Sequence, residues 1–197
     1  MRFSRAIKVV VAFVIVIVGG YLAARFTGKA NGIPNAFSDA RLQGALIAQN
    51  IVNLSSTSVY ELQRINELDR EQKYTEALHV AIQTAAKSKE IRDEAVKLSQ
   101  ELEKMTRALS DIRPDEARHA ALESISNRLA LITHLINYSA YLGELLEALR
   151  TRFSGAPLTE DVAVLVVRVN AEVTEINNFN ARATEAMERF DAIIREK

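Results

Sequence analysis

The sequence predicts an all-α protein: an N-terminal transmembrane helix followed by an elongated antiparallel four-helix bundle of the up-down-up-down type. Three observations support this fold class. Only 7 Gly and 3 Pro occur in 197 residues, so helix-breaking residues are scarce. One unbroken apolar run lies near the N-terminus. In three of the four helical stretches that follow, apolar residues recur at alternating spacings of three and four, which is typical of packed helices.

The N-terminal apolar run predicts a membrane anchor at residues 6–25. Counted from Ala6, the run has about 19 residues, or about 28 Å of helix, which is enough to span the hydrocarbon core of a bilayer. Lys8 lies near its start, where its ammonium group can reach the headgroups. The residues expected to contact lipid are Val9, Val10, Val11, Phe13, Ile15, Ile17, Tyr21 and Leu22.

Basic residues on either side of this run predict its orientation. Arg2 and Arg5, together with the N-terminal amine, outweigh Arg25 and Lys29. The positive-inside rule therefore places the short tail 1–5 in the cytoplasm and the remainder of the chain on the extracytoplasmic side.

Small residues at the end of the run bear on two further questions. A cleaved signal peptide, which would release a secreted protein, is the alternative to an anchor. In Leu22-Ala23-Ala24, however, the bulky Leu22 occupies the −3 position, where the cleavage pattern needs a small residue. The run also has small residues spaced four apart, a pattern that lets two membrane helices approach closely. The candidates for such self-association are Gly19, Gly20, Ala23 and Ala24.

A linker and a folded domain follow the predicted anchor. Residues 26–36 contain two Gly, a Pro and two Asn, which predicts a short flexible linker. Residues 37–197 are expected to form the extracytoplasmic bundle. Its helices are predicted at about 38–69, 74–111, 115–153 and 159–195.

Local chemistry supports the later helix boundaries. Pro114 suits a first helical position, and Asp115 and Glu116 place negative charge at the positive end of the helix dipole. Gly155 follows the third helix where a left-handed residue is favoured, and Pro157 then precedes the polar start of the fourth.

Three helices carry a continuous apolar seam. The third helix has a broader apolar surface than one seam provides, so it needs more than one neighbour, which favours a bundle over a two-stranded coiled coil. The residues expected in the core seam are Leu98, Leu102, Met105, Leu135, Leu142, Leu149, Val169, Val173, Ile176 and Phe190. Asn180 interrupts the fourth seam with a polar side chain.

The predicted topology places two turns at the end of the bundle farthest from the membrane. The first helix leaves the bilayer and the fourth returns to it, so the first and third turns meet at the distal tip. The candidate partner-contact residues there are Arg70, Gln72, Lys73, Ser154 and Gly155.

Composition excludes several kinds of protein. The chain has no cysteine, so disulfides, zinc fingers and thiol nucleophiles are absent. Residues 1–29 hold five basic residues and no acid, which leaves 20 basic against 25 acidic residues in the remainder. Because nonspecific nucleic-acid binding needs a basic surface, this mildly acidic remainder does not predict a nucleic-acid partner.

Catalysis is not expected. Glu76 with His79 and Glu116 with His119 have the Glu-x-x-His spacing of di-iron bundles. They lie near the starts of two antiparallel helices, however, so the rise per residue separates them by most of the bundle length. We therefore expect no metal and no cofactor. His134 lies among apolar residues, which predicts a hydrogen-bonded, partly buried imidazole.

A group of small polar residues in the first and third helices allows two interpretations. Ser55, Ser56, Thr57 and Ser58 could lie level with Tyr138, Ser139, Tyr141 and Gly143. Together they would line a small polar pocket or, the favoured interpretation, form a layer of tightly packed small side chains.

The expected function is protein contact at a membrane. The chain is predicted to bind the lipid bilayer and either another protein or a second copy of itself, as a scaffold or assembly subunit of the cell envelope. The alternative is a ligand-sensing bundle that signals through a membrane partner.

Overall fold

The computed structural model describes residues 33–157 and 161–196, and these contain four long α-helices and no strand. The helices are α3 (Asn35–Arg70), α4 (Tyr74–Arg107), α5 (Asp115–Phe153) and α6 (Val162–Arg195), with a single 3₁₀ turn, η3 (Leu109–Asp111), between α4 and α5. The expectation of an all-helical domain is thus confirmed for the described residues.

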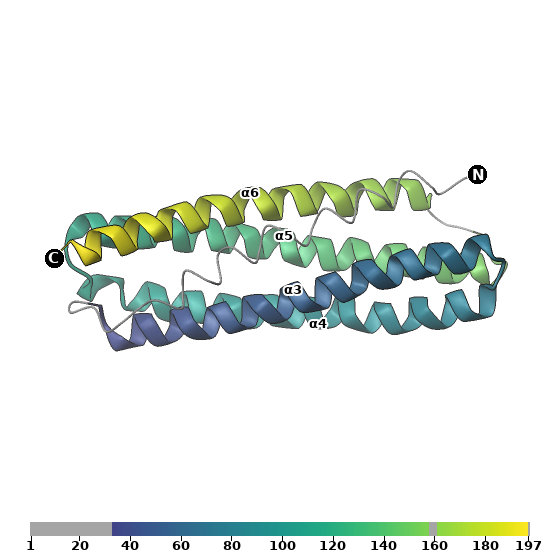
Figure 1. The fold of residues 1–197 in the computed structure, drawn as a ribbon, viewed down its shortest axis with the longest axis horizontal. Helices are drawn as coiled ribbons and strands as arrows, with labels where there is room; N and C mark the ends of the chain where they lie inside the picture. Colours follow the sequence, from purple (N-terminus) through teal and green to yellow (C-terminus); the bar gives the residue numbers. More distant parts are fainter. Residues whose placement is uncertain (1–32, 158–160, 197) are drawn as a thin grey trace.

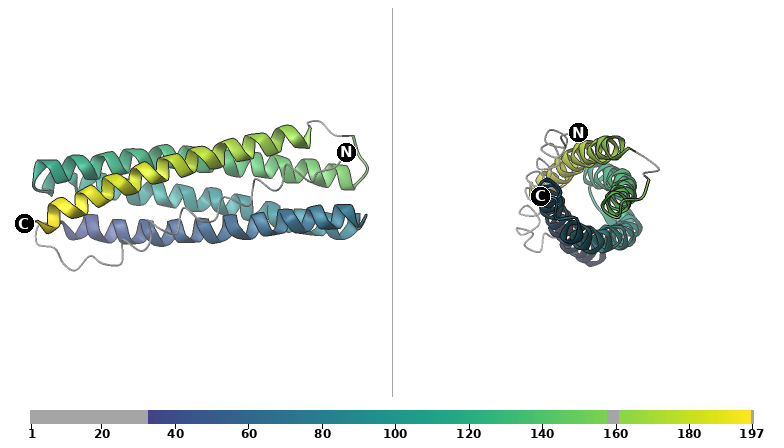
Figure 2. Two further views of the ribbon diagram at one scale, coloured as in Figure 1. Left: turned by 45° about the horizontal axis from the view of Figure 1, so that its top comes forward. Right: turned by 90° about the vertical axis from the view of Figure 1, so that its right-hand side faces the viewer.

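Each helix runs opposite to the one before it and packs along it, so α3 contacts α4, α4 contacts α5, and α5 contacts α6 (Figure 1). The start of α3 and the end of α6 lie at one end of the molecule, whereas the α3–α4 turn and the α5–α6 connection lie at the other. Figure 2 shows that α6 slants across α5, so that its last turns approach the start of α3.

The first and fourth helices meet near this shared end. The rings of Phe37 and Phe190 lie with their centroids 5.4 Å apart. One turn farther along α3, Arg41 forms two 2.7 Å hydrogen bonds to the carboxylate of Asp191. Both side chains are nearly buried, with exposed fractions of 12% and 10%. This pair therefore links α3 directly to α6, although the main helix packing runs from α3 to α4, from α4 to α5 and from α5 to α6.

The observed helix ends correct several predicted boundaries. α3 begins at Asn35, so the last residues of the predicted linker are helical, and Pro34 occupies the cap position. This start is physically reasonable because proline lacks only an N–H that a helix start leaves unbonded. α4 ends at Arg107 rather than at 111, because the chain tightens into η3 there.

The starts of the last two helices depend on different residues. Pro114 is the cap of α5 rather than its first helical residue, and Asp115 and Glu116 occupy the first turn. α6 begins at Val162, where the Asp161 side chain accepts a 2.9 Å hydrogen bond from the backbone N–H of Ala163. The predicted start at residue 159 lies outside the described residues.

The core runs the length of the helices. The ten predicted seam residues are all buried, from Leu98 on α4 to Phe190 on α6. α3 packs on α4 at Gly44, where a Cβ would lie 3.4 Å from the Leu98 side chain, an ordinary van der Waals distance. Burial of this apolar surface is the main stabilising contribution to the fold.

The predicted membrane anchor at 6–25, its tail and its small-residue positions lie outside the described residues. Within the described part of the chain, no helix combines the length and apolar character needed to cross a bilayer.

Candidate functional site

The structure brings the five predicted tip residues to one end. Arg70 is the last residue of α3, Gln72 and Lys73 form the α3–α4 turn, and Ser154 and Gly155 follow α5 at the same end (Figure 1). All five are exposed. Their role in binding a partner stays a prediction.

Two interactions hold the two sides of this end together. Arg152 of α5 forms an ion pair with Asp69 of α3, with 3.0 Å between the nitrogen and the carboxylate oxygen. The rings of Tyr74 and Phe153 stack at a centroid distance of 6.1 Å. Because one contact joins α5 to α3 and the other joins α5 to α4, the tip is a single structural unit.

Both tip turns use the same cap geometry. Gly155 has φ of 75°, its N–H bonds to the carbonyl of Arg152, and the next N–H bonds to the carbonyl of Thr151. This pattern is a Schellman cap. The α3–α4 turn has the same pattern, but Gln72, with φ of 60°, occupies the left-handed position that usually favours glycine.

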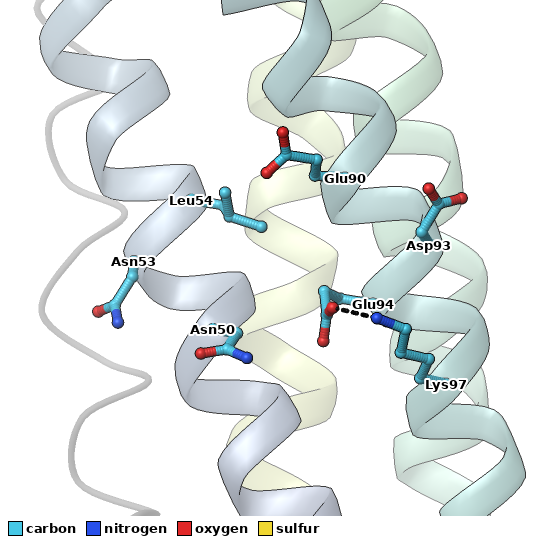
Figure 3. A pocket seen from close by; sticks show the side chains of 7 residues that line it. All are labelled: Asn50, Asn53, Leu54, Glu90, Asp93, Glu94 and Lys97. Carbon is cyan, nitrogen blue, oxygen red and sulfur yellow. Dashed lines mark hydrogen bonds and ion pairs between the residues drawn. The ribbon is translucent and has the colours of Figure 1, made fainter.

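A surface pocket of about 340 Å³ lies between α3 and α4, nearer the middle of the helices. Glu90, Asp93 and Glu94 line one side of it, and Lys97 pairs with Glu94 at 2.7 Å. Asn50, Asn53 and Leu54 line the other side. In Figure 3 the carboxylates of Glu90 and Asp93 point in different directions. The described residues contain no group of three or more acids and histidines arranged to hold a metal ion.

Four of the predicted group of small polar residues are buried inside the bundle, namely Ser55 and Ser58 of α3 and Tyr138 and Ser139 of α5. Ser56, Tyr141 and Gly143 are partly exposed, and Thr57 is exposed. Burial raises the pKa of Tyr138, and the neighbouring Ser55 hydroxyl opposes this shift. The favoured packing-layer interpretation therefore agrees with the burial of these side chains.

The second helix adds residues to this layer that sequence reasoning missed. Thr84 and Ser88 of α4 are also buried. The Thr84 hydroxyl lies 2.9 Å from Glu61 of α3, which also pairs with Lys87. Thr84 and Ser88 lie on the three-and-four spacing of the second predicted seam when it is continued from Leu98 toward the start of α4. The spacing alone therefore predicts that both residues are buried.

The three histidines have different surroundings. His79 and His119 are exposed and lie near the starts of α4 and α5, at opposite ends of the molecule. His134 is half-buried, and its Nδ1 lies 2.7 Å from the carboxylate of Glu172 on α6. Its ring also stacks on Phe179 at a centroid distance of 5.3 Å. His134 thus joins α5 to α6.

An arginine in the core row of α5 is the least expected feature. Arg128 is half-buried, and its Nε has no accessible surface and no hydrogen-bond partner. Burial, and secondly the charge of Arg41, lower its pKa to about 10. At neutral pH it is therefore a cation between the helices.

No family model matches the chain, and it matches no curated protein and no solved structure.

Proposed function

We propose that this chain is a single-pass membrane protein that acts by protein contact, as a scaffold or assembly subunit of the cell envelope. Its N-terminal apolar segment at 6–25 anchors an elongated up-down-up-down bundle, which stands on the extracytoplasmic side. Partner contact occurs at the tip formed by the α3–α4 turn and the start of the α5–α6 connection.

The observation that carries this proposal is the position of Asn35. α3 begins only ten residues after the predicted anchor and has 36 residues, so it extends about 54 Å away from its start. Both tip turns lie at the opposite end from Asn35 (Figure 1). A chain anchored just before α3 would therefore present these turns at the greatest distance from the bilayer.

The chemistry of the tip supports a binding role. Arg70, Glu71 and Lys73 supply charge within four consecutive residues, and each is exposed. The paired caps and the stacked Tyr74–Phe153 rings hold the backbone in one arrangement. A preorganised surface loses less conformational entropy on binding than a mobile loop does.

Site-specific photocrosslinking in native membranes tests this proposal. One variant carries a photoreactive amino acid at Gln72, and the matched control carries it at Glu103, an exposed residue near the other end of the molecule. We expect adducts with one defined protein at Gln72 and none with that protein at Glu103, identified by mass spectrometry. Adducts with the chain itself would restrict the function to homo-oligomerisation. The absence of any adduct at Gln72 would contradict contact through the tip.

A further inference from the structure

α5 carries a second row of residues at alternating spacings of four and three, on the side away from its buried row. Leu122 and Leu129 in this row are 48% and 46% exposed. Because residues with this spacing share one side of a helix, the row forms a continuous strip on the surface. We call it the outer seam, and it consists of Leu122, Ser126, Leu129, Thr133, Ile136, Ala140 and Gly143, each fully or partly exposed.

None of the side chains in the outer seam is charged, although the seam extends over 22 residues, or about 33 Å of helix. The exposed face of a helix in a soluble domain normally carries charged side chains. On α4, for example, Asp93, Lys97 and Lys104 are exposed. An uncharged strip with two exposed leucines is typical instead of a helix that has a further packing partner.

α4 borders the outer seam on one side and adds apolar surface to it. A Cβ on Gly143 would lie 3.6 Å from the Ser88 hydroxyl, so these two residues are at the same level. Because α4 and α5 run in opposite directions, Val96 is level with Ile136 (Figure 1). Val96 is 47% exposed, and it projects away from the α3–α4 pocket, because Glu94, two residues earlier, lines that pocket.

The charges beside the outer seam are opposite on its two sides. Glu144 lies on the side toward α6, one turn after Tyr141, whose ring contacts Arg168 of α6. On the other side, Lys89 and Arg92 share a face of α4 with Val96. Glu144, Lys89 and Arg92 are exposed, and none of them forms an ion pair with another described residue.

We propose that the outer seam is an interface with a second copy of this chain, whose α5 packs alongside in the same direction. In a parallel pair related by a two-fold axis along the helices, each side of the seam faces the opposite side of the partner's seam. Glu144 of each copy then lies level with Lys89 of the other, since these residues directly follow Gly143 and Ser88.

The charges near the other end of the seam agree with the parallel arrangement. Glu103 and Glu123 are already paired within the chain, with Arg107 and Arg189. An antiparallel pair centred near Thr133 would bring Glu144 of one copy to Glu123 of the other. Only the parallel pair joins Glu144 to the unpaired cations, and such charges beside a helical seam determine its orientation.

The size of the strip suits a specific dimer. A strip about 33 Å long and two helix diameters, or about 20 Å, wide would bury about 1,300 Å² in total, and specific interfaces bury about 1,200–2,000 Å². The interface goes beyond the proposed function and does not rest on the membrane anchor or the tip. A parallel pair is also the arrangement that two chains anchored in one bilayer would adopt.

Oxidative crosslinking of the purified full chain in a non-ionic detergent tests the interface, because the chain contains no cysteine of its own. Thr133→Cys lies at the centre of the seam, and the matched control Thr57→Cys lies on the exposed side of α3. Because a disulfide needs Cα atoms within about 7 Å, Thr133→Cys should give about tenfold more covalent dimer than Thr57→Cys. Equal yields from the two variants would overturn the proposal.

Two further variants distinguish the orientation of the pair. Ser126 and Ala140 lie seven residues before and after Thr133. In a parallel pair each residue meets its own counterpart, so Ser126→Cys should form a covalent dimer alone. In an antiparallel pair only a mixture of Ser126→Cys and Ala140→Cys would form one, and that result would contradict the proposed arrangement.

Sedimentation of the full chain measures the association without a crosslink. Leu129→Lys places two like charges next to each other at the two-fold axis, so the dissociation constant should rise about tenfold or more. The matched control is Leu46→Lys on α3, because Leu46 is 43% exposed, and it should keep the wild-type constant. A monomeric wild type, or equal weakening by the two lysines, would show that the seam is not the interface. Neither result bears on contact through the tip, which crosslinking at Gln72 tests separately.

Discussion

Replacing Gln72 by glycine should stabilise the protein, because Gln72 holds a left-handed backbone conformation at the cap of α3. Its φ is 60°, a conformation that costs a residue with a Cβ about 1–2 kcal/mol. Glycine avoids this cost but loses about 0.5–1 kcal/mol through the greater freedom of the unfolded chain. The difference predicts a gain of about 0.5–1 kcal/mol for Gln72→Gly.

Two further variants make this experiment specific for the backbone. Gln72→Ala removes the same exposed side chain and keeps the unfavourable φ, so we expect little change. Gly155 has φ of 75° in the corresponding cap after α5, and a Cβ there would meet no atom within 4 Å. Gly155→Ala should therefore destabilise the protein by about 1 kcal/mol through the backbone alone.

Urea unfolding of the full chain, followed by helical circular dichroism, measures these differences as shifts in the midpoint at constant slope. If Gln72→Gly lowered stability, or if Gly155→Ala left it unchanged, the assignment of left-handed caps to these two turns would be wrong.

The remaining predictions concern the core. Gly44→Ala and Gly143→Ala should each stabilise the protein by up to about 1 kcal/mol in urea unfolding, because the new Cβ would make contacts of 3.4 and 3.6 Å and alanine favours helix. Burial raises the pKa of Tyr138, so the folded state keeps a proton that the unfolded state loses above pH 10. Above pH 10, the free energy of unfolding of the wild type should therefore fall with pH more steeply than that of Tyr138→Phe. The difference between the two slopes should be about 1.4 kcal/mol per pH unit, and equal slopes would contradict this burial. Arg41→Met should cost about 3–5 kcal/mol by leaving Asp191 buried without its partner, and replacing both residues by methionine should recover much of this loss in the same unfolding assay.

Helical periodicity was the most informative signal in the sequence. The seams through Leu98, Leu142 and Val173 identify buried faces because burial of apolar side chains on a helix repeats every three to four residues. The position of Gly155 similarly follows from the chemistry of helix ends, since few other residues adopt positive φ without cost.

Two features were missed because the residue types point away from their positions. Arg128 lies on the spacing of the third seam, seven residues before the first predicted seam residue, Leu135, but an arginine is rarely found in a core. Gln72 occupies a cap position without the glycine that would have indicated it. In both cases the tertiary structure imposes a position that the intrinsic preference of the residue disfavours.

α3 begins at Asn35, before the predicted start at about residue 38, for a related reason. Gly, Pro and Asn before Ser38 indicate a linker, yet Pro34 is compatible with a helix cap, and helix begins directly after it. If the predicted anchor holds the chain in a membrane, this earlier helix start limits how freely the bundle can turn relative to it.

Single-cysteine labelling tests the membrane arrangement most directly, because the chain contains no other cysteine. Ser4→Cys lies in the predicted cytoplasmic tail, and Ser154→Cys lies at the exposed tip. In intact cells, a membrane-impermeant maleimide should label Ser154→Cys at once and Ser4→Cys only after the membrane is permeabilised. Labelling of Ser4→Cys but not Ser154→Cys in intact cells, or recovery of both variants in the soluble fraction, would contradict an anchored bundle on the extracytoplasmic side.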